Sequence, residues 1–155
     1  MNNKDTSCIF CKIVKGEFDS VKIWENKDFL AILDVNPNTK GMTLVLPKKH
    51  YDSYIFNMEK ETLNEFIASA KTVAKILERY FKIKRVALVA EGMGVNHAHF
   101  KLYPLHGITD DFKEMWAKEK IYFEKYQGYI STQLGEKKEM SELESLAKEI
   151  RKLGN

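Results

Sequence analysis

One long amphipathic helix, predicted from about Met58 to Tyr80, restricts the fold of this chain more than any other feature. Apolar residues recur in it at steps of three and four, so that they share one face of the helix. A helix with one apolar face has to bury that face against another layer of secondary structure. The apolar positions are Leu63, Phe66, Ile67, Ala70, Val73, Ala74, Leu77 and Tyr80.

Short β-rich runs on both sides of this helix predict the layer that it covers. The first two are separated by Asn26-Lys27-Asp28, which indicates a hairpin, and the last two by a turn that contains Gly92 and Gly94. Five such strands around one helix favour an α+β domain with an antiparallel sheet. The predicted strands are 21–25, 29–33, 42–46, 85–91 and 98–103.

Two further helices are predicted near the ends of the chain. Residues 8–15 have helical spacing of apolar side chains and stop at Gly16, a residue type that commonly ends helices. Residues 141–153 begin with Ser141 and Glu144, the pattern of a capping box, and are followed by Gly154. The aromatic and charged segment 107–137 allows two interpretations: a helical hairpin packed on the sheet, or a lid or partner-binding surface.

Composition indicates a single folded domain. The 155 residues are 44% hydrophobic and 30% charged, without a repeat or a linker-like stretch, which excludes disorder and low-complexity classes. We expect one domain over 1–155, with its core at 8–105 and a helical extension at 107–155. No apolar run approaches the ~18 residues of a membrane span, and Met1 to Ser7 is polar, so a soluble cytoplasmic protein is expected. The net charge of +3 is spread among mixed charges, which does not indicate nucleic acid as a partner.

The segment from His97 to Tyr103 carries the strongest chemical signal. On a strand, alternate side chains point to opposite faces. Ala98, Phe100 and Leu102 would then face the core, while the other face presents His97, His99, Lys101 and Tyr103. Imidazoles beside an ammonium group suit a phosphoryl group, and the glycine turn just upstream can offer backbone N–H groups to an anion.

These residues resemble the signature of the histidine triad (HIT) family. GMGVNHAHFKLYP matches the signature itself, and CIFCKIVKGE, FLAILDVNP and KGMTLVLPKKH resemble the corresponding stretches of the Hint and Fhit branches. The resemblance covers about residues 8–105. It implies a HIT-like fold, with a five-stranded antiparallel sheet packed with a long helix and a C-terminal helix.

The resemblance also implies a mechanism. The middle histidine of the triad, here His99, would attack the α-phosphate of a nucleotide and form a nucleotidyl-histidine intermediate, with His97 and Lys101 completing the triad. The ammonium of Lys101 would help to keep His99 neutral. Lys101 is itself a departure, because most members have a third histidine there. Met93 and Gly94 depart from a common glutamine and serine, which affects leaving-group handling more than nucleotide binding.

A nucleoside site is implied by the same resemblance. Asp34 matches the acidic residue that accepts hydrogen bonds from the ribose hydroxyls, although it could also form an Asx turn before Asn36. Gly92 and Gly94 would lie near the phosphates, and a purine is the implied base. The residues that match the walls around the base, which could also be ordinary core, are Ile9, Phe10, Ile13, Ile32 and Val35.

Cys8 and Cys11 form the one CxxC pair of the chain. Such a pair could be a metal half-site, two buried thiols or a redox pair. In a subset of HIT proteins it joins two histidines, which here would be His50 and His97. Two thiolates and two imidazoles make a closed structural Zn²⁺ site.

The expected function is that of an enzyme: a nucleotide hydrolase or nucleotidyltransferase acting on dinucleoside polyphosphates such as Ap3A or Ap4A, or on nucleoside phosphoramidates. The alternative is a nucleotide-binding regulator with little turnover, suggested by Met93, Gly94 and Lys101. A deadenylase similar to aprataxin is a third interpretation, disfavoured by the near-neutral charge. The resemblance further implies a homodimer. His106 could approach the phosphates but is expected to be a surface histidine, and Lys48 and Lys49 are expected to be solvated.

Overall fold

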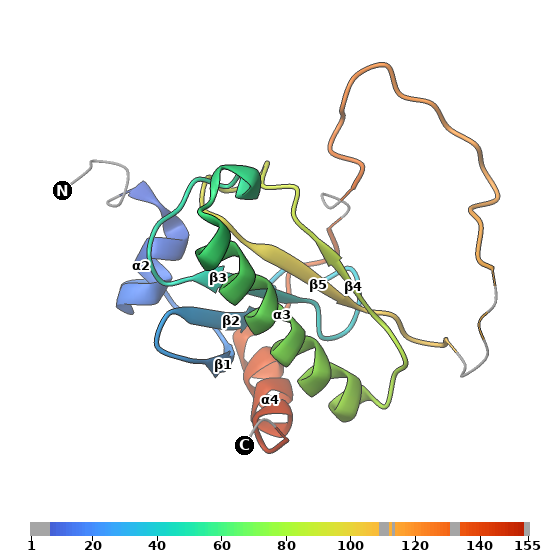
Figure 1. Cartoon of the computed structure of the whole chain (residues 1–155). Coiled ribbons are helices and arrows are strands. Elements are labelled where there is room, and N and C mark those ends of the chain that lie inside the picture. The colour runs from blue at the N-terminus through green and yellow to red at the C-terminus, as the bar shows by residue number, and fades with distance from the viewer. Residues whose placement is uncertain (1–6, 109–111, 113, 131–133, 154–155) are drawn as a thin grey trace.

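Five antiparallel strands form one sheet in the order β1-β2-β3-β5-β4 (Figure 1). The computed structural model describes residues 7–108, 112, 114–130 and 134–153. All five predicted strands and the antiparallel sheet are confirmed, with the last two strands shorter than expected. The strands are β1 (Lys22–Glu25), β2 (Phe29–Leu33), β3 (Thr43–Pro47), β4 (Val86–Val89) and β5 (Phe100–Pro104).

The two faces of the sheet carry two separate apolar clusters. Every residue of β2 and β3 is buried, because both faces of these strands are covered. Alternate side chains therefore enter different clusters. One cluster contains Phe29, Ala31, Leu33 and Val45, and the other contains Leu30, Ile32, Leu44 and Leu46.

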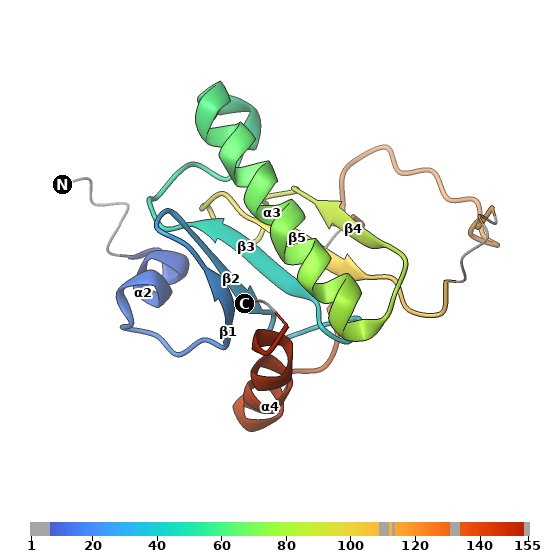
Figure 2. The same ribbon diagram turned by 60° about the horizontal axis from the view of Figure 1, so that its bottom comes forward.

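Helices cover both faces (Figure 2). The predicted long helix is α3 (Lys60–Phe81), which follows the short 3-10 turn η1 (Ile55–Asn57). It buries Phe66, Ala70, Val73 and Leu77 in the first cluster together with α4 (Met140–Arg151). The short helix α2 (Ile9–Lys15) contributes its buried side chains to the second cluster. The arrangement confirms the α+β fold predicted from the sequence.

The predicted capping box of the last helix is wrong. The N-cap residue of α4 is Glu139, which makes no side-chain cap hydrogen bond, and Ser141 already lies inside the helix. The pattern of Ser141 and Glu144 occurs by chance within the first turns. The helix also ends at Arg151, before the predicted stop at 153. Its burial of Leu143, Ala147 and Ile150, and not a cap, holds the helix against the body.

The helical hairpin predicted for 107–137 is also wrong, since the described residues of this segment contain no helix or strand. Figure 1 shows the chain leaving the end of β5, running away from the body and returning before α4. Short amphipathic helices are stable only when their apolar face is buried, and here the aromatic side chains are exposed. Gly128, with a φ of +80°, additionally interrupts helical geometry.

The described part of the chain has no helix with the length and apolarity needed to cross a bilayer. The assignment of residues 1–155 to a single domain stays a prediction.

Candidate functional site

The two histidines of the signature lie just before β5, which starts at Phe100. As predicted, the histidine side chains do not enter the core on the α3 side, whereas Ala98, Phe100 and Leu102 pack in that core. His97 and His99 are buried and both face Phe10 of α2, with ring centroids 5.7 and 5.2 Å from it. The loop before the strand and the N-terminal helix together therefore enclose the two imidazoles.

A backbone hydrogen bond fixes the tautomer of His99. Its Nδ1 lies 2.7 Å from the carbonyl oxygen of His97. A carbonyl oxygen only accepts hydrogen bonds, so Nδ1 must carry the proton and donate. In the neutral ring the lone pair is then on Nε2. This is the nitrogen that can act as a nucleophile or accept a proton.

The surroundings of His99 keep its ring neutral. Burial lowers the pKa of His99, and the nearby ammonium of Lys101 lowers it further. The hydrogen bond to His97 and the carboxylate of Asp34 act in the opposite direction and only partly offset the decrease in this pKa. Lys101, which is half-buried, thus has the effect expected from the sequence, but desolvation is the larger cause.

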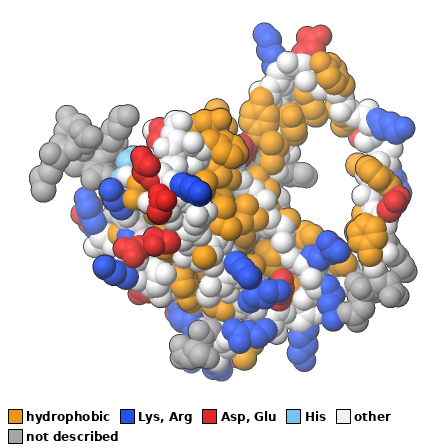
Figure 3. Space-filling model, in the orientation of Figure 1, with side chains coloured by type: hydrophobic (Ala, Val, Ile, Leu, Met, Phe, Trp, Pro, Cys, Tyr) orange, Lys and Arg blue, Asp and Glu red, His pale blue; other side chains and the backbone are white. Residues whose placement is uncertain are grey.

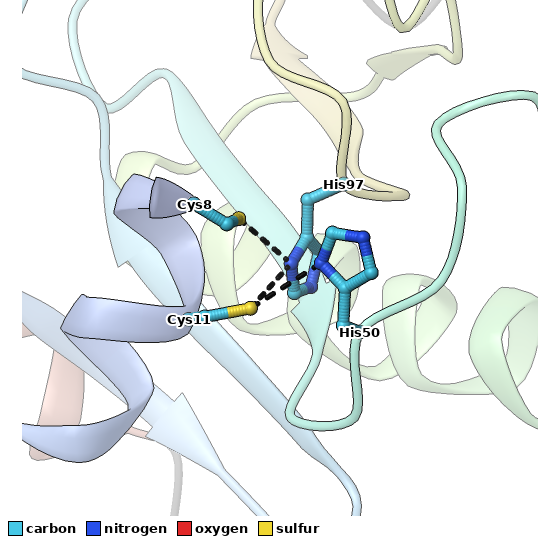
Figure 4. A group of neighbouring side chains, drawn as sticks. All are labelled: Cys8, Cys11, His50 and His97. Atoms are coloured by element: carbon cyan, nitrogen blue, oxygen red, sulfur yellow. Dashed lines mark hydrogen bonds between the residues drawn. The ribbon is translucent and has the colours of Figure 1, made fainter. Parts of the chain in front are cut away.

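Cys8, Cys11, His50 and His97 form a compact cluster between α2 and the loops before β5 and after β3 (Figure 4). Four candidate ligand atoms, one from each residue, all lie within 4.8 Å of one another. Cys8 Sγ is 3.4 Å and Cys11 Sγ is 3.5 Å from His97 Nδ1, and Cys11 Sγ is 3.3 Å from His50 Nδ1. Tetrahedral Zn²⁺ with ordinary bond lengths would space its ligands about 3.3–3.8 Å apart.

The orientation of His97 also suits a metal ligand. Its Nε2 lies 2.9 Å from the carbonyl oxygen of Pro47, so Nε2 must be the protonated donor. Nδ1 is then unprotonated and points at the two sulfur atoms. Metal-bound histidines usually donate their other ring N–H to such an acceptor, which holds the ring in place. The donor set and its hydrogen bonding therefore fit a structural metal site.

The two glycines of the turn before His97 have different surroundings. Gly92 has a φ of +73°, and a Cβ there would lie 2.7 Å from the backbone oxygen of Ser53. A Cβ on Gly94, in contrast, would have no atom of the described residues within 4 Å beyond its chain neighbours. The loops are further joined by a 3.0 Å hydrogen bond from the Ser53 N–H to the side-chain oxygen of Asn96. Gly92 is thus required by packing, whereas Gly94 leaves space.

Replacing Gly92 by alanine is expected to lower the free energy of unfolding by about 2–3 kcal/mol. The substitution combines an unfavourable positive φ with a collision against fixed backbone. Gly94→Ala is the matched control, and its effect should stay within about 0.5 kcal/mol. Urea unfolding of both variants measures the difference, and equal stabilities would contradict the assigned contact.

A cavity of about 380 Å³ lies beside the metal-type cluster. It is lined by Ser7, Cys8, Ile9, His50, Gly94, Val95 and Asn96. It therefore opens between the start of α2 and the glycine turn, where the resemblance places the phosphate groups. Met93, next to this turn, is 70% exposed, so its side chain is not part of the core.

The predicted nucleoside residues are divided between the two faces of the sheet. Phe10, Ile13 and Ile32 belong to the cluster on the α2 face, and Ile9 is partly exposed beside it. Val35 packs against the α3-side cluster instead. Asp34 is buried, and one of its oxygens accepts the Asn36 N–H at 2.8 Å, so the Asx turn considered from the sequence is present. The role of these residues in binding stays a prediction.

A second cavity, of about 600 Å³, lies between the loop at 37–41, Tyr80 and α4. Asp34 lines this cavity, but neither His97 nor His99 does. Neither imidazole lines the 380 Å³ cavity either. The contact of both rings with Phe10 of α2, and not a cavity, is what points the candidate chemistry to the α2 face.

Sequence reasoning missed two contributors to the site. The carbonyl of Pro47 holds His97, but a backbone acceptor leaves no mark on the sequence beyond its place at a strand end. The side-chain oxygen of Asn96 accepts a hydrogen bond from the Ser53 N–H and so joins the two loops. Its position directly before His97 could have suggested that it positions the loop. His106 is exposed as predicted, but its Nε2 also donates to the Lys40 oxygen at 2.9 Å. Lys48 forms an ion pair with Glu25 at 3.0 Å.

The structure has the fold of histidine triad proteins. Two buried histidines lie just before the inner strand β5, and one long helix packs on the sheet. The structure superposes on a histidine triad nucleotide-binding protein from Sulfolobus tokodaii with a TM-score of 0.72. The identity is 27%, and the alignment covers 95% of this chain and 91% of that one. The sequence agrees, since residues 15–107 match the HIT domain. The chain belongs to the HIT family.

Relatives from archaea and yeast are similar over most of the matched region. A HIT-like protein of Methanocaldococcus jannaschii is 40% identical over 102 residues, covering 63% of this chain and 78% of that protein. The adenosine 5'-monophosphoramidase of Saccharomyces cerevisiae is 32% identical over 123 residues, covering 78% of this chain and 77% of that protein. The family, with hydrolases of phosphoramidates among its members, is thus the one expected from the sequence.

Proposed function

We propose that this protein is a nucleotide hydrolase or nucleotidyltransferase that acts at an α-phosphate through a nucleotidyl intermediate on His99. The observation that carries the proposal is the hydrogen bond from His99 Nδ1 to the His97 carbonyl. It leaves Nε2 as the nucleophilic nitrogen. When Nε2 bonds to phosphorus, the ring keeps its Nδ1 proton and becomes cationic. The His97 carbonyl oxygen already accepts the hydrogen bond from Nδ1 before the reaction starts, so it is positioned to stabilise the positive charge that develops on the His99 ring.

A nucleoside phosphoramidate would react in two steps. The lone pair of His99 Nε2 forms a bond to the α-phosphorus while the P–N bond to the amine breaks. The amine keeps the electron pair and takes a proton from water. A water molecule then attacks phosphorus, the N–P bond to His99 breaks, and its pair returns to Nε2. The products are the nucleoside monophosphate and the free amine, and the water proton is released to solvent.

The similarity to the yeast adenosine 5'-monophosphoramidase supports a phosphoramidate as substrate. Dinucleoside polyphosphates such as Ap3A or Ap4A require the same attack at an α-phosphate with a phosphate leaving group. In either case we infer that Asp34 binds the ribose of a purine nucleotide and that Ile9, Phe10, Ile13, Ile32 and Val35 surround the base. Gly92 and Gly94 would lie near the phosphates of the bound nucleotide.

Lys101 is proposed to hold a phosphate oxygen and to keep His99 in its neutral form. Replacing it by alanine should move the acid limb of the kcat/KM profile to higher pH. The sign follows from the charge: the Lys101 ammonium lowers the pKa of His99, so its removal lets the imidazole become protonated, and inactive, at a higher pH. Lys101→Arg keeps the charge and serves as control. An acid limb that does not move in Lys101→Ala would contradict this role.

We also propose that Cys8, Cys11, His50 and His97 hold one structural Zn²⁺. Support comes from the four clustered donors and from the His97 Nε2–H bond to Pro47. The ion would tie α2 to the loops that carry His50 and His97. Two buried thiols without metal, or a redox pair, remain the alternatives for the cysteines, and both would leave the purified protein without bound zinc.

The alternative function is a nucleotide-binding regulator with little turnover. It is favoured by the replacement of the usual third histidine by Lys101 and by the exposed Met93 at the glycine turn. Incubation with adenosine 5'-phosphoramidate and with Ap4A separates the two. Release of AMP supports the enzyme, whereas tight AMP binding without release from either substrate supports the regulator and contradicts the proposed activity.

We further propose that the protein is cytoplasmic and forms a homodimer.

A further inference from the structure

Glu91, just after β4, has a buried carboxylate oxygen that no contact within the fold explains. Its Oε1 atom is covered by the surrounding chain and has no hydrogen-bond partner among the described residues. Burying a polar group without a partner lowers the stability of a protein. Native proteins leave only a few such groups unpaired, and a catalytic role is one reason for their presence.

The register of the sheet sets Glu91 across from His99. Val89, the last residue of β4, pairs with Lys101 of β5 in an antiparallel ladder. Continuing this pairing by two residues brings Glu91 opposite His99. Residues directly opposite each other in an antiparallel pair share one face of the sheet, so the register assigns Glu91 to the face that carries the candidate nucleophile.

The packing of β4 agrees with this assignment. Val86 and Ala90 pack against the cluster on the α3 side. Because successive side chains point to opposite faces, Glu91 belongs to the other face, on which His99 contacts Phe10 of α2. Neighbouring strands lie about 4.8 Å apart, which is enough to place a carboxyl group beside a phosphoryl group on His99 and not against the imidazole itself.

The proposed reaction needs a proton carrier at this place. The amine that leaves a phosphoramidate has to gain a proton, and the water molecule that attacks afterwards has to lose one. In an in-line displacement the water takes the position that the amine has vacated. One carboxyl group beside that position can therefore act as general acid in the first step and as general base in the second.

The histidines are committed to other contacts. The Nδ1–H of His99 donates to the carbonyl of His97, and the Nε2–H of His97 donates to the carbonyl of Pro47. The Nδ1 atom of His97 faces the sulfur atoms of the two cysteines. Neither ring has a proton directed to a leaving group.

Other potential donors are also unsuitable. Lys101 is proposed to hold a phosphate oxygen, and Gly94 has no side chain. The described part of the segment 112–130 stands away from the body with open space between them (Figure 3). Its three tyrosines are exposed and are not packed on the catalytic face. Glu91 is thus the acid that the fold offers at this place.

We propose that Glu91 is a catalytic residue that carries the proton in both steps. As His99 Nε2 bonds to phosphorus and the P–N bond breaks, the neutral carboxyl group of Glu91 gives its proton to the departing amine. The carboxylate then takes a proton from the attacking water, while the N–P bond breaks and its electron pair returns to Nε2. Phosphoramidate and water become nucleoside monophosphate and amine, and Glu91 ends in its starting form.

The bound phosphate favours the form of Glu91 that the first step requires. Phosphate oxygens are negatively charged, and a second negative charge at the same site is unfavourable, so the carboxyl group holds a proton while the substrate is bound. The inference rests on the proposed function, since it assigns a role within that reaction.

Rapid kinetics with two substrates tests the role of Glu91. Adenosine 5'-phosphoramidate loses an amine that needs a proton, whereas the p-nitrophenyl ester of AMP loses a phenolate that needs none. In Glu91→Gln, AMP release from the phosphoramidate should fall about a hundredfold or more, as is usual when a general acid is lost. The ester should release its first equivalent of p-nitrophenolate within about threefold of the wild-type rate. Its later turnovers should be slow, because the water step has lost its base.

Glu61→Gln is the matched control, since it removes an exposed carboxylate from the first turn of α3, and it should leave both rates unchanged. The inference is overturned if Glu91→Gln slows the first turnover of both substrates equally, if phosphoramidate turnover is unchanged, or if later turnovers of the ester keep the wild-type rate. Wild-type protein that releases AMP from neither substrate would instead contradict the proposed function itself, and the role of Glu91 with it.

Unfolding in urea separates a catalytic role of Glu91 from a structural one. Glu91→Gln keeps the shape of the side chain, and a neutral amide is less costly to bury than a carboxylate. The urea midpoint of the variant should equal or exceed that of the wild type, as is common for a residue kept for function at the expense of stability. A clearly lower midpoint would mean that Glu91 supports the fold, and would contradict the inference.

Discussion

Replacing His99 by alanine is expected to lower kcat for adenosine 5'-phosphoramidate by about 10⁴-fold or more, because the attacking nitrogen is lost. His97 cannot take over its role. The Nε2–H of His97 donates to Pro47 and its Nδ1 faces the sulfur atoms of Cys8 and Cys11. Steady-state kinetics, with AMP affinity measured in parallel, shows whether the substitution removes chemistry while leaving binding intact.

The matched control is His106→Ala, which removes an exposed imidazole that bonds to the Lys40 carbonyl and does not take part in the site. Its kcat should be unchanged. Rapid acid-free quenching of the wild type with labelled substrate should also trap phosphorus on His99. Full turnover by His99→Ala would rule out the covalent mechanism. The mechanism would also be ruled out if the wild type turned over a substrate whose second step is slow and no phosphohistidine could be trapped.

Replacing Cys8 and Cys11 by serine is expected to remove one equivalent of zinc and to lower the melting temperature by about 10 °C. Both cysteines are buried, and the cluster joins α2 to two loops. Loss of a structural ion removes its binding free energy from the folded state. If about 4 kcal/mol of that energy is lost, a chain of this size melts about 10 °C lower. Metal analysis of chelator-free protein and calorimetry measure both effects.

The variant His106→Ala controls for the loss of a histidine outside the cluster and should retain one zinc per chain. Addition of a strong chelator to the wild type should reproduce the lower melting temperature without any mutation. Less than about a tenth of an equivalent of zinc in wild-type protein, or a double serine variant as stable as wild type, would instead favour two buried thiols.

The periodicity of apolar residues predicted the fold well, because the side chains that it places on one face of a helix or strand are mostly buried in the structure. The α3 face is buried at Phe66, Ala70, Val73 and Leu77 as expected, although Ile67 is 48% exposed. The capping box at Ser141 failed because such short polar patterns also occur inside helices. The helical hairpin at 107–137 failed because apolar spacing does not reveal whether a surface exists to pack against.

The candidate site was predictable where side chains carry the chemistry, and less so where the backbone does. The CxxC pair and the two histidines could be placed together only through the family resemblance, since they are far apart along the chain. Nothing in the sequence indicates that the carbonyls of Pro47 and His97 set both tautomers. Asp34 shows a different limit: its Asx turn and its proposed ribose contact are compatible, because a carboxylate has two oxygens.

Position 97 serves two neighbours by chemically separate means: its ring faces the sulfur atoms, while its main-chain oxygen holds His99. Only the first depends on the residue type, since every amino acid has a carbonyl group. A change of side chain at position 97 would therefore alter the cluster with Cys8 and Cys11, whereas the acceptor that keeps the proton of His99 on Nδ1 is retained as long as the backbone follows the same path.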